Sequence, residues 1–180
     1  MTVRIVTDSA CDLSEEETTA LDIDVVPLSI RFGEVEYIDR QELSVPDFYK
    51  EMSSSEHLPQ TAAPAPGAFG EIFTNRLNAG AESVVCINLS SGVSATMQSA
   101  QTGAQESGGD VRVVDSYSVS AGQGTIVLAA ANAAKNGASA DEIMALVSDL
   151  SSRTRVYGAL DTLENLKKGE IGRASCRERV

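Results

Sequence analysis

The feature that most constrains this chain is an alternation of short apolar runs with segments that carry helical signals. The run SVVCINL at residues 83–89 is apolar at consecutive interior positions, so a strand there would bury both of its faces. Shorter β-branched runs at residues 3–7 and 111–116 each precede a segment with helical character. Because helices connect parallel strands, this order predicts an α/β fold with a mostly parallel sheet and helices on both faces.

Helix starts are marked by capping signals. Ser14 with Glu17, and Ser139 with Glu142, have the spacing of a capping box, which predicts helices that begin just after each serine. Ser44 at the cap position, three residues before Asp47, predicts another helix that runs through Met52. The remaining helices are predicted at residues 68–77, 93–107, 125–134 and 163–168.

Three further segments complete the predicted order of elements. Residues 25–30 and 35–38 are apolar and are separated by RFGE, a spacing typical of a hairpin. Residues 52–67, MSSSEHLPQTAAPAPG, are polar and rich in proline and are predicted to be a linker. Residues 156–160 are predicted to form a last strand.

The charge balance excludes several classes of partner. The chain has 14 Lys and Arg against 26 Asp and Glu, which gives a formal net charge of -12. Nucleic acids and anionic membrane surfaces need clustered basic residues, so neither is an expected partner. The longest weakly polar stretch, residues 126–134, is far shorter than the roughly 20 residues of a membrane-spanning helix. We therefore expect a cytoplasmic protein that is not an integral membrane protein.

The cysteines and the single histidine indicate neither disulfides nor a metal site. Cys11, Cys86 and Cys176 lack metal-ligand spacing, and His57 lies in a serine-rich segment without a nearby cysteine. Cys11 could be a nucleophile near a helix start, although a small apolar filler is the simpler interpretation. No metal ion and no cofactor are expected.

Three serine-rich segments follow predicted strands. They are TDSACDL at residues 7–13, LSSGVSAT at residues 89–96 and VDSYSVSAGQG at residues 114–124. In open α/β sheets, ligands bind beyond the carboxyl ends of the strands, where helix N-termini and hydroxyl groups favour an anion. The same pattern is equally typical of serine and threonine residues that only cap helices.

Asp8 and Asp12 raise an enzymatic alternative. Carboxylates that follow a strand can hold magnesium in a phosphotransfer enzyme or a phosphohydrolase. Their spacing of four residues across a turn does not favour a shared cation, and aspartates after strands commonly serve as turn and cap residues. Catalysis by this pair is therefore the second hypothesis.

Five motifs together carry a family resemblance. VTDSACDL, PQTAAPAPGAF, NLSSGVSATMQSA, VVDSYSVSAGQG and DTLENLKKG occur in this order, and the chain resembles the DegV family from its N-terminus to about Gly169. The resemblance implies a two-domain α/β protein that buries one long-chain fatty acid between its domains. It also implies a carrier that presents the acyl carboxylate to a fatty acid kinase and performs no chemistry itself.

The resemblance also implies which residues hold the carboxylate. The carboxylate-binding threonine of the family falls on Thr61 in PQTAAP, and its serine falls on Ser94 in SSGVSAT. Two hydroxyl groups can both donate to one carboxylate, although a turn residue and a helix cap are the simpler interpretations of the two residues. Ala62 and Ala63 replace a polar pair that often follows the threonine in the family.

The end of the chain departs from the family pattern. Residues 170–180, EIGRASCRERV, can be back-translated into a widely used sequencing-library adapter. We therefore expect residues 1–169 to be a DegV-like N-terminal α/β domain and residues 170–180 to be a non-native tail encoded by adapter. The second domain implied by the resemblance would then be missing from this chain.

Overall fold

The chain forms two compact units. The computed structural model describes residues 2–159. Unit 1 consists of Met1–Leu28 and Ala63–Val156, and unit 2 contains Ser29–Ala62. The chain therefore leaves unit 1 after the second strand of its sheet and returns to it before the third.

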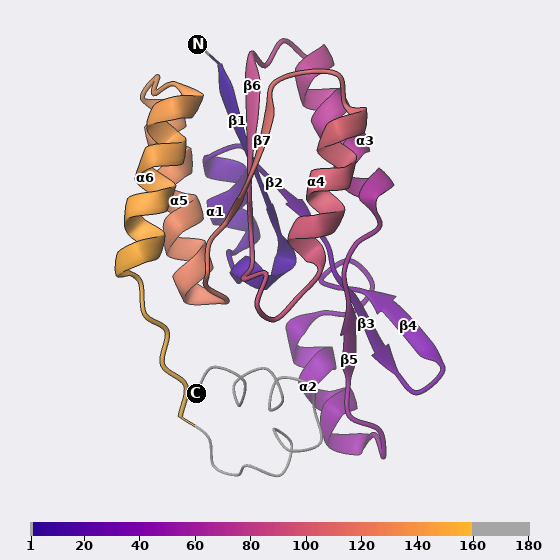
Figure 1. The fold of residues 1–180 in the computed structure, drawn as a ribbon. Helices are drawn as coiled ribbons and strands as arrows, with labels where there is room; N and C mark the ends of the chain where they lie inside the picture. The colour runs from indigo at the N-terminus through magenta and orange to yellow at the C-terminus, as the bar shows by residue number, and fades with distance from the viewer. Residues whose placement is uncertain (1, 160–180) are drawn as a thin grey trace. The chain divides into compact units, whose positions relative to one another are not determined.

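A four-stranded parallel sheet lies at the centre of unit 1 (Figure 1). Each strand pairs in parallel with its neighbours, and their order across the sheet is β2 (Ile23–Val26), β1 (Val3–Asp8), β6 (Ser83–Asn88) and β7 (Val111–Asp115). All residues of β6 are buried, as expected of a strand that is covered on both faces. The predicted parallel sheet is confirmed.

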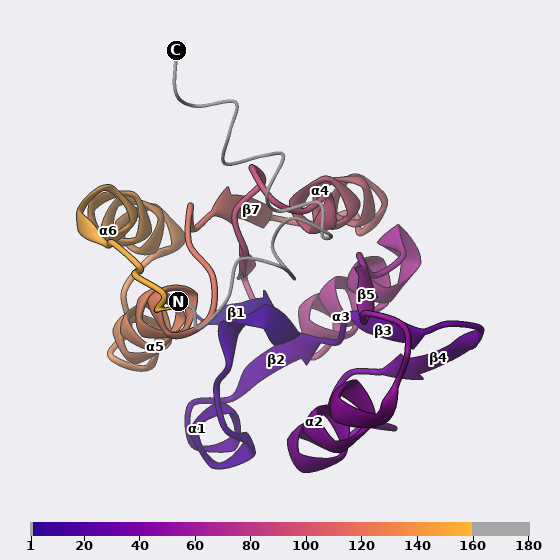
Figure 2. The same cartoon turned by 90° about the horizontal axis from the view of Figure 1, so that it is seen from below.

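Helices cover both faces of this sheet, as Figure 2 shows. The helices α3 (Pro66–Asn78) and α4 (Thr96–Glu106) lie on one face, and α5 (Ala121–Lys135) and α6 (Ala140–Arg153) lie on the other. Successive residues of β1 point to opposite faces of the sheet. Ile5 packs with residues of α5 and α6, and Val6 packs with residues of α3 and α4. This alternation is the pleat of a strand between two helical layers.

Both predicted capping boxes are present. In α1 (Glu15–Ala20), the Ser14 amide donates to Glu17 Oε2 at 2.9 Å, and the Glu17 amide donates to Ser14 Oγ at 3.2 Å. Ser139 and Glu142 make the same reciprocal bonds at the start of α6. The serine backbone N–H lowers the pKa of each glutamate below its ordinary value.

Unit 2 is an antiparallel sheet with one helix. The strand β3 (Ser29–Phe32) lies between β4 (Val35–Ile38) and β5 (Gln60–Ala62). The helix α2 (Val45–Ser54) begins after Ser44, as predicted, and the Asp47 amide donates to the Ser44 hydroxyl at 3.2 Å. The small apolar cluster of this unit consists of Ile30, Phe32 and Leu43, with Tyr37 and Phe48 packed against it.

One strand prediction and the linker prediction are wrong in part. The expected strand at residues 25–30 is divided, because Pro27 lacks the N–H that would continue the ladder. Its first half belongs to β2 and its second half to β3, which forms the predicted hairpin with β4. The expected linker at residues 52–67 contains β5, which pairs with β3.

The other corrections concern element ends. The helix expected at residues 93–107 begins only at Thr96, and Val93 lies exposed in the preceding loop. The helix expected at residues 125–134 begins earlier, at Ala121. Residues 156–159, the described part of the expected last strand, have no regular structure. The helix predicted at residues 163–168 and the predicted tail at residues 170–180 lie outside the described residues.

Candidate ligand-binding site

The three serine-rich segments meet at the carboxyl edge of the parallel sheet in unit 1. They follow β1, β6 and β7, whose carboxyl ends lie side by side (Figure 1). Backbone hydrogen bonds join them: the Ser120 amide donates to the Ala10 carbonyl at 2.8 Å, and the Ser90 amide donates to the Ser118 carbonyl at 2.9 Å. We call residues 9–13, 89–95 and 116–120 the carboxyl-edge loops.

A buried carboxylate lies beneath these loops. Asp8, the last residue of β1, is 0% exposed. Its Oδ2 accepts from Asn88 Nδ2 at 3.0 Å and from the Leu89 amide at 2.9 Å. Its Oδ1 accepts from Gln123 Nε2 at 3.0 Å and from the Ala10 amide at 3.2 Å. Burial raises the pKa of Asp8, and these hydrogen bonds, that from Gln123 first, act in the opposite direction.

A second buried carboxylate joins two of the loops. Asp115 ends β7, and its Oδ2 accepts from the Ser91 amide at 3.1 Å. Its Oδ1 accepts from the Tyr117 amide at 2.7 Å. This contact accompanies a left-handed backbone at Tyr117, with φ of 50°, and the tyrosine side chain is 75% exposed. Asp115 therefore shapes the loop after β7 and ties it to the loop after β6.

Ser94 lies in the loop that leads from β6 into α4. Its amide donates to the Ser90 carbonyl at 3.2 Å, and its Oγ accepts from the Thr96 amide at 3.2 Å. The Ser94 and Thr96 hydroxyls lie 2.9 Å apart. An open hollow of about 490 Å³ begins at this point and is lined by Ser91, Ser94, Ala95, Met97, Gln98 and Gln101. Ser94 thus bonds to the first turn of α4 and also faces a hollow.

Thr61 lies in unit 2, at the centre of β5, and is exposed. It pairs with Ile30 of β3, which in turn pairs with Tyr37 of β4. Directly paired residues share a face of a sheet, so Thr61 lies on the apolar face that packs against Phe48 of α2. Ser94 belongs to one of the carboxyl-edge loops of unit 1, and Thr61 belongs to unit 2.

The geometry does not favour magnesium chemistry at Asp8 and Asp12. Asp8 is buried and already accepts four hydrogen bonds. Within residues 2–159, no group of three or more His, Cys, Asp or Glu side chains is arranged to hold a metal ion. Cys11 and Cys86 are buried, and burial raises the pKa of the Cys86 thiol, which keeps it protonated.

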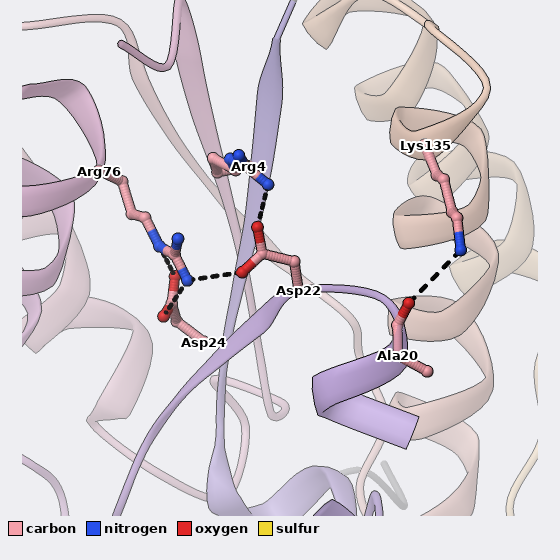
Figure 3. Close-up of polar contacts among 6 residues, drawn as sticks. All are labelled: Arg4, Ala20, Asp22, Asp24, Arg76 and Lys135. Atoms are coloured by element: carbon pink, nitrogen blue, oxygen red, sulfur yellow. Dashed lines mark hydrogen bonds and ion pairs between the residues drawn. The ribbon is translucent and has the colours of Figure 1, made fainter. Parts of the chain in front are cut away.

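The amino edge of the same sheet carries a different polar cluster, drawn in Figure 3. Arg76 of α3 contacts Asp24 Oδ1 at 2.7 Å and Asp22 Oδ1 at 2.9 Å, and Arg4 also pairs with Asp22. Lys135 donates to the Ala20 carbonyl at 3.4 Å. A hollow of about 420 Å³ borders this cluster, with Arg4, Asp22 and Lys135 among its lining residues. The charges shown there are paired with one another or with backbone.

Sequence reasoning did not identify three of the residues that build the carboxyl edge. Asn88 and Asp115 are polar residues at the ends of apolar strands, and Gln123 is a buried amide between two glycines in a helix of small residues. In each case the available signal was a polar side chain within an apolar or small-residue run. The partner that Asn88 and Gln123 share, Asp8, is distant in sequence, and so is Ser91, the partner of Asp115 in the other loop, so these pairings were not predictable.

No helix within residues 2–159 is long and apolar enough to cross a bilayer.

Comparison with known proteins identifies the family. A family model described as "Uncharacterised protein, DegV family" matches residues 2–176. A DegV domain-containing protein of Streptococcus pyogenes serotype M6 is 38% identical over 97% of this chain, which spans 63% of the length of that relative.

Two solved structures resemble the fold. A DegV family protein from Thermus thermophilus, described by its fatty acid binding, has a TM-score of 0.86 and 33% identity, over 94% of this chain and 60% of that one. DegV from Bacillus subtilis, described as a fatty acid binding protein, has a TM-score of 0.88 and 31% identity, over 94% of this chain and 61% of that one. The family match and these likenesses agree with the parallel sheet and its two helical layers, and the chain belongs to the DegV family.

Proposed function

We propose that this chain binds a long-chain fatty acid through its carboxylate, with the Ser94 and Thr61 hydroxyls as hydrogen-bond donors. The observation that carries the proposal is Ser94 at the start of α4, facing an open hollow at the carboxyl edge. The relatives from Thermus thermophilus and Bacillus subtilis, both described as binding fatty acids, support the choice of ligand.

The chemistry at Ser94 suits a carboxylate. The Ser94 oxygen accepts from the Thr96 amide, so its own hydrogen can point to a ligand. Thr96 is fully buried, and its hydroxyl can donate to Ser94 Oγ at 2.9 Å, which polarises the serine further. A carboxylate bound there would accept a charge-assisted hydrogen bond and would lie near the positive end of the α4 dipole.

The surroundings of Thr61 suit the junction of head group and acyl chain. Its exposed hydroxyl shares a sheet face with Ile30 and Tyr37. A donor beside apolar side chains can hold a carboxylate while the adjacent methylenes leave water, and each buried methylene contributes about 0.8 kcal/mol. Ala62 follows on the opposite face of β5, so it does not compete for the ligand on the Thr61 face.

In this proposal the chain is a carrier and not an enzyme. It presents the carboxylate to a fatty acid kinase in the cytoplasm, and the kinase would supply the phosphoryl group. The acidic balance of 26 Asp and Glu against 14 Lys and Arg suits a small-molecule ligand and a protein partner better than a nucleic acid. No cofactor is needed for this role.

Native mass spectrometry with lipid extraction tests the proposal. The full-length product of the gene is purified as wild type and as the double variant Thr61→Ala and Ser94→Ala. We expect a co-purifying long-chain fatty acid in the wild type and its depletion in the double variant. Lipid that remains undiminished in the double variant would exclude these two hydroxyls as the carboxylate site.

We also propose that residues 1–169 form the DegV-like part of the chain and that residues 170–180 are encoded by adapter. The sequence of the parent gene tests this division. Codons for the same eleven residues followed by a natural stop codon would rule it out.

A further inference from the structure

We infer that Asp8 is a positioning residue for the proposed carboxylate site, because its hydrogen bonds fix the carboxyl-edge loop that carries Ser94. The inference deepens the proposed function and rests on it for its binding measurement. Asp8 does not contact the proposed ligand, since it is buried beneath the loops. It would act through the backbone of residues 89–94.

The hydrogen bonds of Asp8 come from three separate parts of the chain. Capping of the short turn η1 (Ser9–Cys11) accounts for the Ala10 amide alone. Asn88 ends β6, Leu89 begins the loop that follows it, and Gln123 belongs to the first turn of α5. A carboxylate that served only as a local cap would not need these distant donors. The ionised group satisfies all four with two oxygens, which no neutral side chain of the same shape can do.

A short path leads from Asp8 to Ser94. The Leu89 amide, held by Asp8 at 2.9 Å, begins the loop. The next residue, Ser90, is held by the Ser118 carbonyl, and its own carbonyl accepts from the Val93 and Ser94 amides at 3.1 and 3.2 Å. The loop is therefore a compact turn whose first residue is anchored by Asp8. Release of that anchor would free the turn that sets the position of Ser94.

Asp8→Asn is the sharpest variant, because it keeps the shape of the side chain. One carboxylate oxygen becomes an NH2 group, which must face either Asn88 and Leu89 or Gln123 and Ala10. The backbone amide on that side, of Leu89 or Ala10, then loses its acceptor, because a backbone N–H cannot turn as the side-chain amides of Asn88 and Gln123 can. The matched control is Asp24→Asn, the same substitution on β2, where the carboxylate accepts from Arg76 and not from any carboxyl-edge loop.

The experiment measures palmitate affinity in the full-length product of the gene by displacement of a fluorescent fatty acid. We expect Asp8→Asn to weaken binding about tenfold, the factor expected from roughly one lost hydrogen bond, and Asp24→Asn to change it by less than about twofold. In the Ser94→Ala background, Asp8→Asn should weaken binding by less than about threefold, because the group it positions has been removed. A full tenfold effect in that background, or none in the wild-type background, overturns the inference.

Amide hydrogen exchange provides an independent readout. We expect the Leu89 amide of the wild type to be protected as strongly as the amides of β6, and its exchange to accelerate at least about tenfold in Asp8→Asn. If the variant fails to fold, amide exchange in the wild-type protein still tests the inference. A wild-type Leu89 amide that exchanges as fast as the exposed Gly92 amide overturns it. If Ser94→Ala leaves palmitate binding unchanged, the proposed function fails, and the exchange data still show whether Asp8 fixes the loop.

Discussion

The two edges of the parallel sheet in unit 1 use aspartate in opposite ways. At the amino edge, Asp22 is 47% exposed at its side chain and pairs with the guanidinium groups of Arg4 and Arg76 (Figure 3). At the carboxyl edge, Asp8 is fully buried and accepts only from backbone and amide N–H groups.

This difference shows how one residue type can serve two purposes. Exposed ion pairs link neighbouring elements but contribute little, because water and salt screen them. A buried carboxylate is costly unless every lone pair is used, and it then fixes the backbone groups that it accepts from. The carboxyl edge is therefore the more rigidly specified of the two, and Ser94 lies there.

The largest effect is expected from removal of the buried carboxylate. Asp8→Ala leaves four donors without their acceptor, and at about 1 kcal/mol each we expect the free energy of unfolding to fall by about 4 kcal/mol. Asp22→Asn at the amino edge, which suits the left-handed backbone at that position (φ of 52°), should cost less than about 1 kcal/mol. Urea denaturation at pH 7 measures both, and equal losses would contradict the comparison.

A smaller loss in the free energy of unfolding is expected when a side chain crowds the carboxyl edge. A Cβ atom at Gly124 would lie 2.5 Å from the Cys11 carbonyl oxygen, so Gly124→Ala must push α5 away from the loop after β1. We expect a loss of about 2 kcal/mol.

Gly67→Ala is the matched control for this substitution. Apart from the adjacent residues and the backbone of α3 itself, no atom lies within 4 Å of the corresponding Cβ, so we expect a gain of about 0.5 kcal/mol. Thermal unfolding of both variants checks the pair, and a neutral Gly124→Ala would show that the edge is loosely packed.

The amino edge should respond to salt. Arg76→Met removes the ion pairs with Asp22 and Asp24, and we expect a loss of about 1 kcal/mol at low ionic strength. The loss should shrink in 1 M salt, where the Debye length is about 3 Å. The loss caused by Asp8→Ala should change little under the same conditions, and a parallel decline of both would refute the distinction between the edges.

The smallest effects are titration shifts of opposite sign. Burial raises the pKa of Asp8 above its ordinary 3.8, whereas Arg112 lowers the pKa of Asp110 at the amino edge below that value. The Asp8 contribution to stability therefore falls as pH rises from 3.8 through the folded pKa of this group. The Asp110 contribution is present above 3.8 and is lost as pH falls through its folded pKa. NMR titration of the side-chain carboxyl carbons measures both midpoints, and midpoints on the same side of 3.8 would contradict this account.

Most of the fold of unit 1 was predictable from local signals. These signals involve residues that are close in sequence: the capping boxes at Ser14 and Ser139 and the apolar run of β6. The structure confirms all three. In contrast, β5 has three exposed residues and is defined by its pairing with Ile30, which no local pattern reveals. The break at Pro27 carried a signal, but the change from one sheet to another depends on tertiary context.

The site shows the same division. The position of the three serine-rich loops could be predicted, because each follows a predicted strand. The carboxyl ends of parallel strands lie at one edge of the sheet, so the loops were expected to lie close together. The network of Asp8 with Asn88 and Gln123 joins residues separated by 80 and 115 positions, and no sequence pattern pairs them. The sequence alone makes Asp8 a candidate magnesium ligand, yet its burial and its four donors show that it supports the carboxyl-edge loops.

The most direct test of the central claim compares palmitate with hexadecanol, which has the same chain length and no carboxylate. Dissociation constants are measured for the full-length product of the gene, as wild type and with Thr61→Ala and Ser94→Ala together. We predict that the wild type prefers the acid by about tenfold or more, and that the preference disappears in the double variant. Equal affinity of the wild type for both ligands, or an unchanged preference in the double variant, would contradict the proposed carboxylate site.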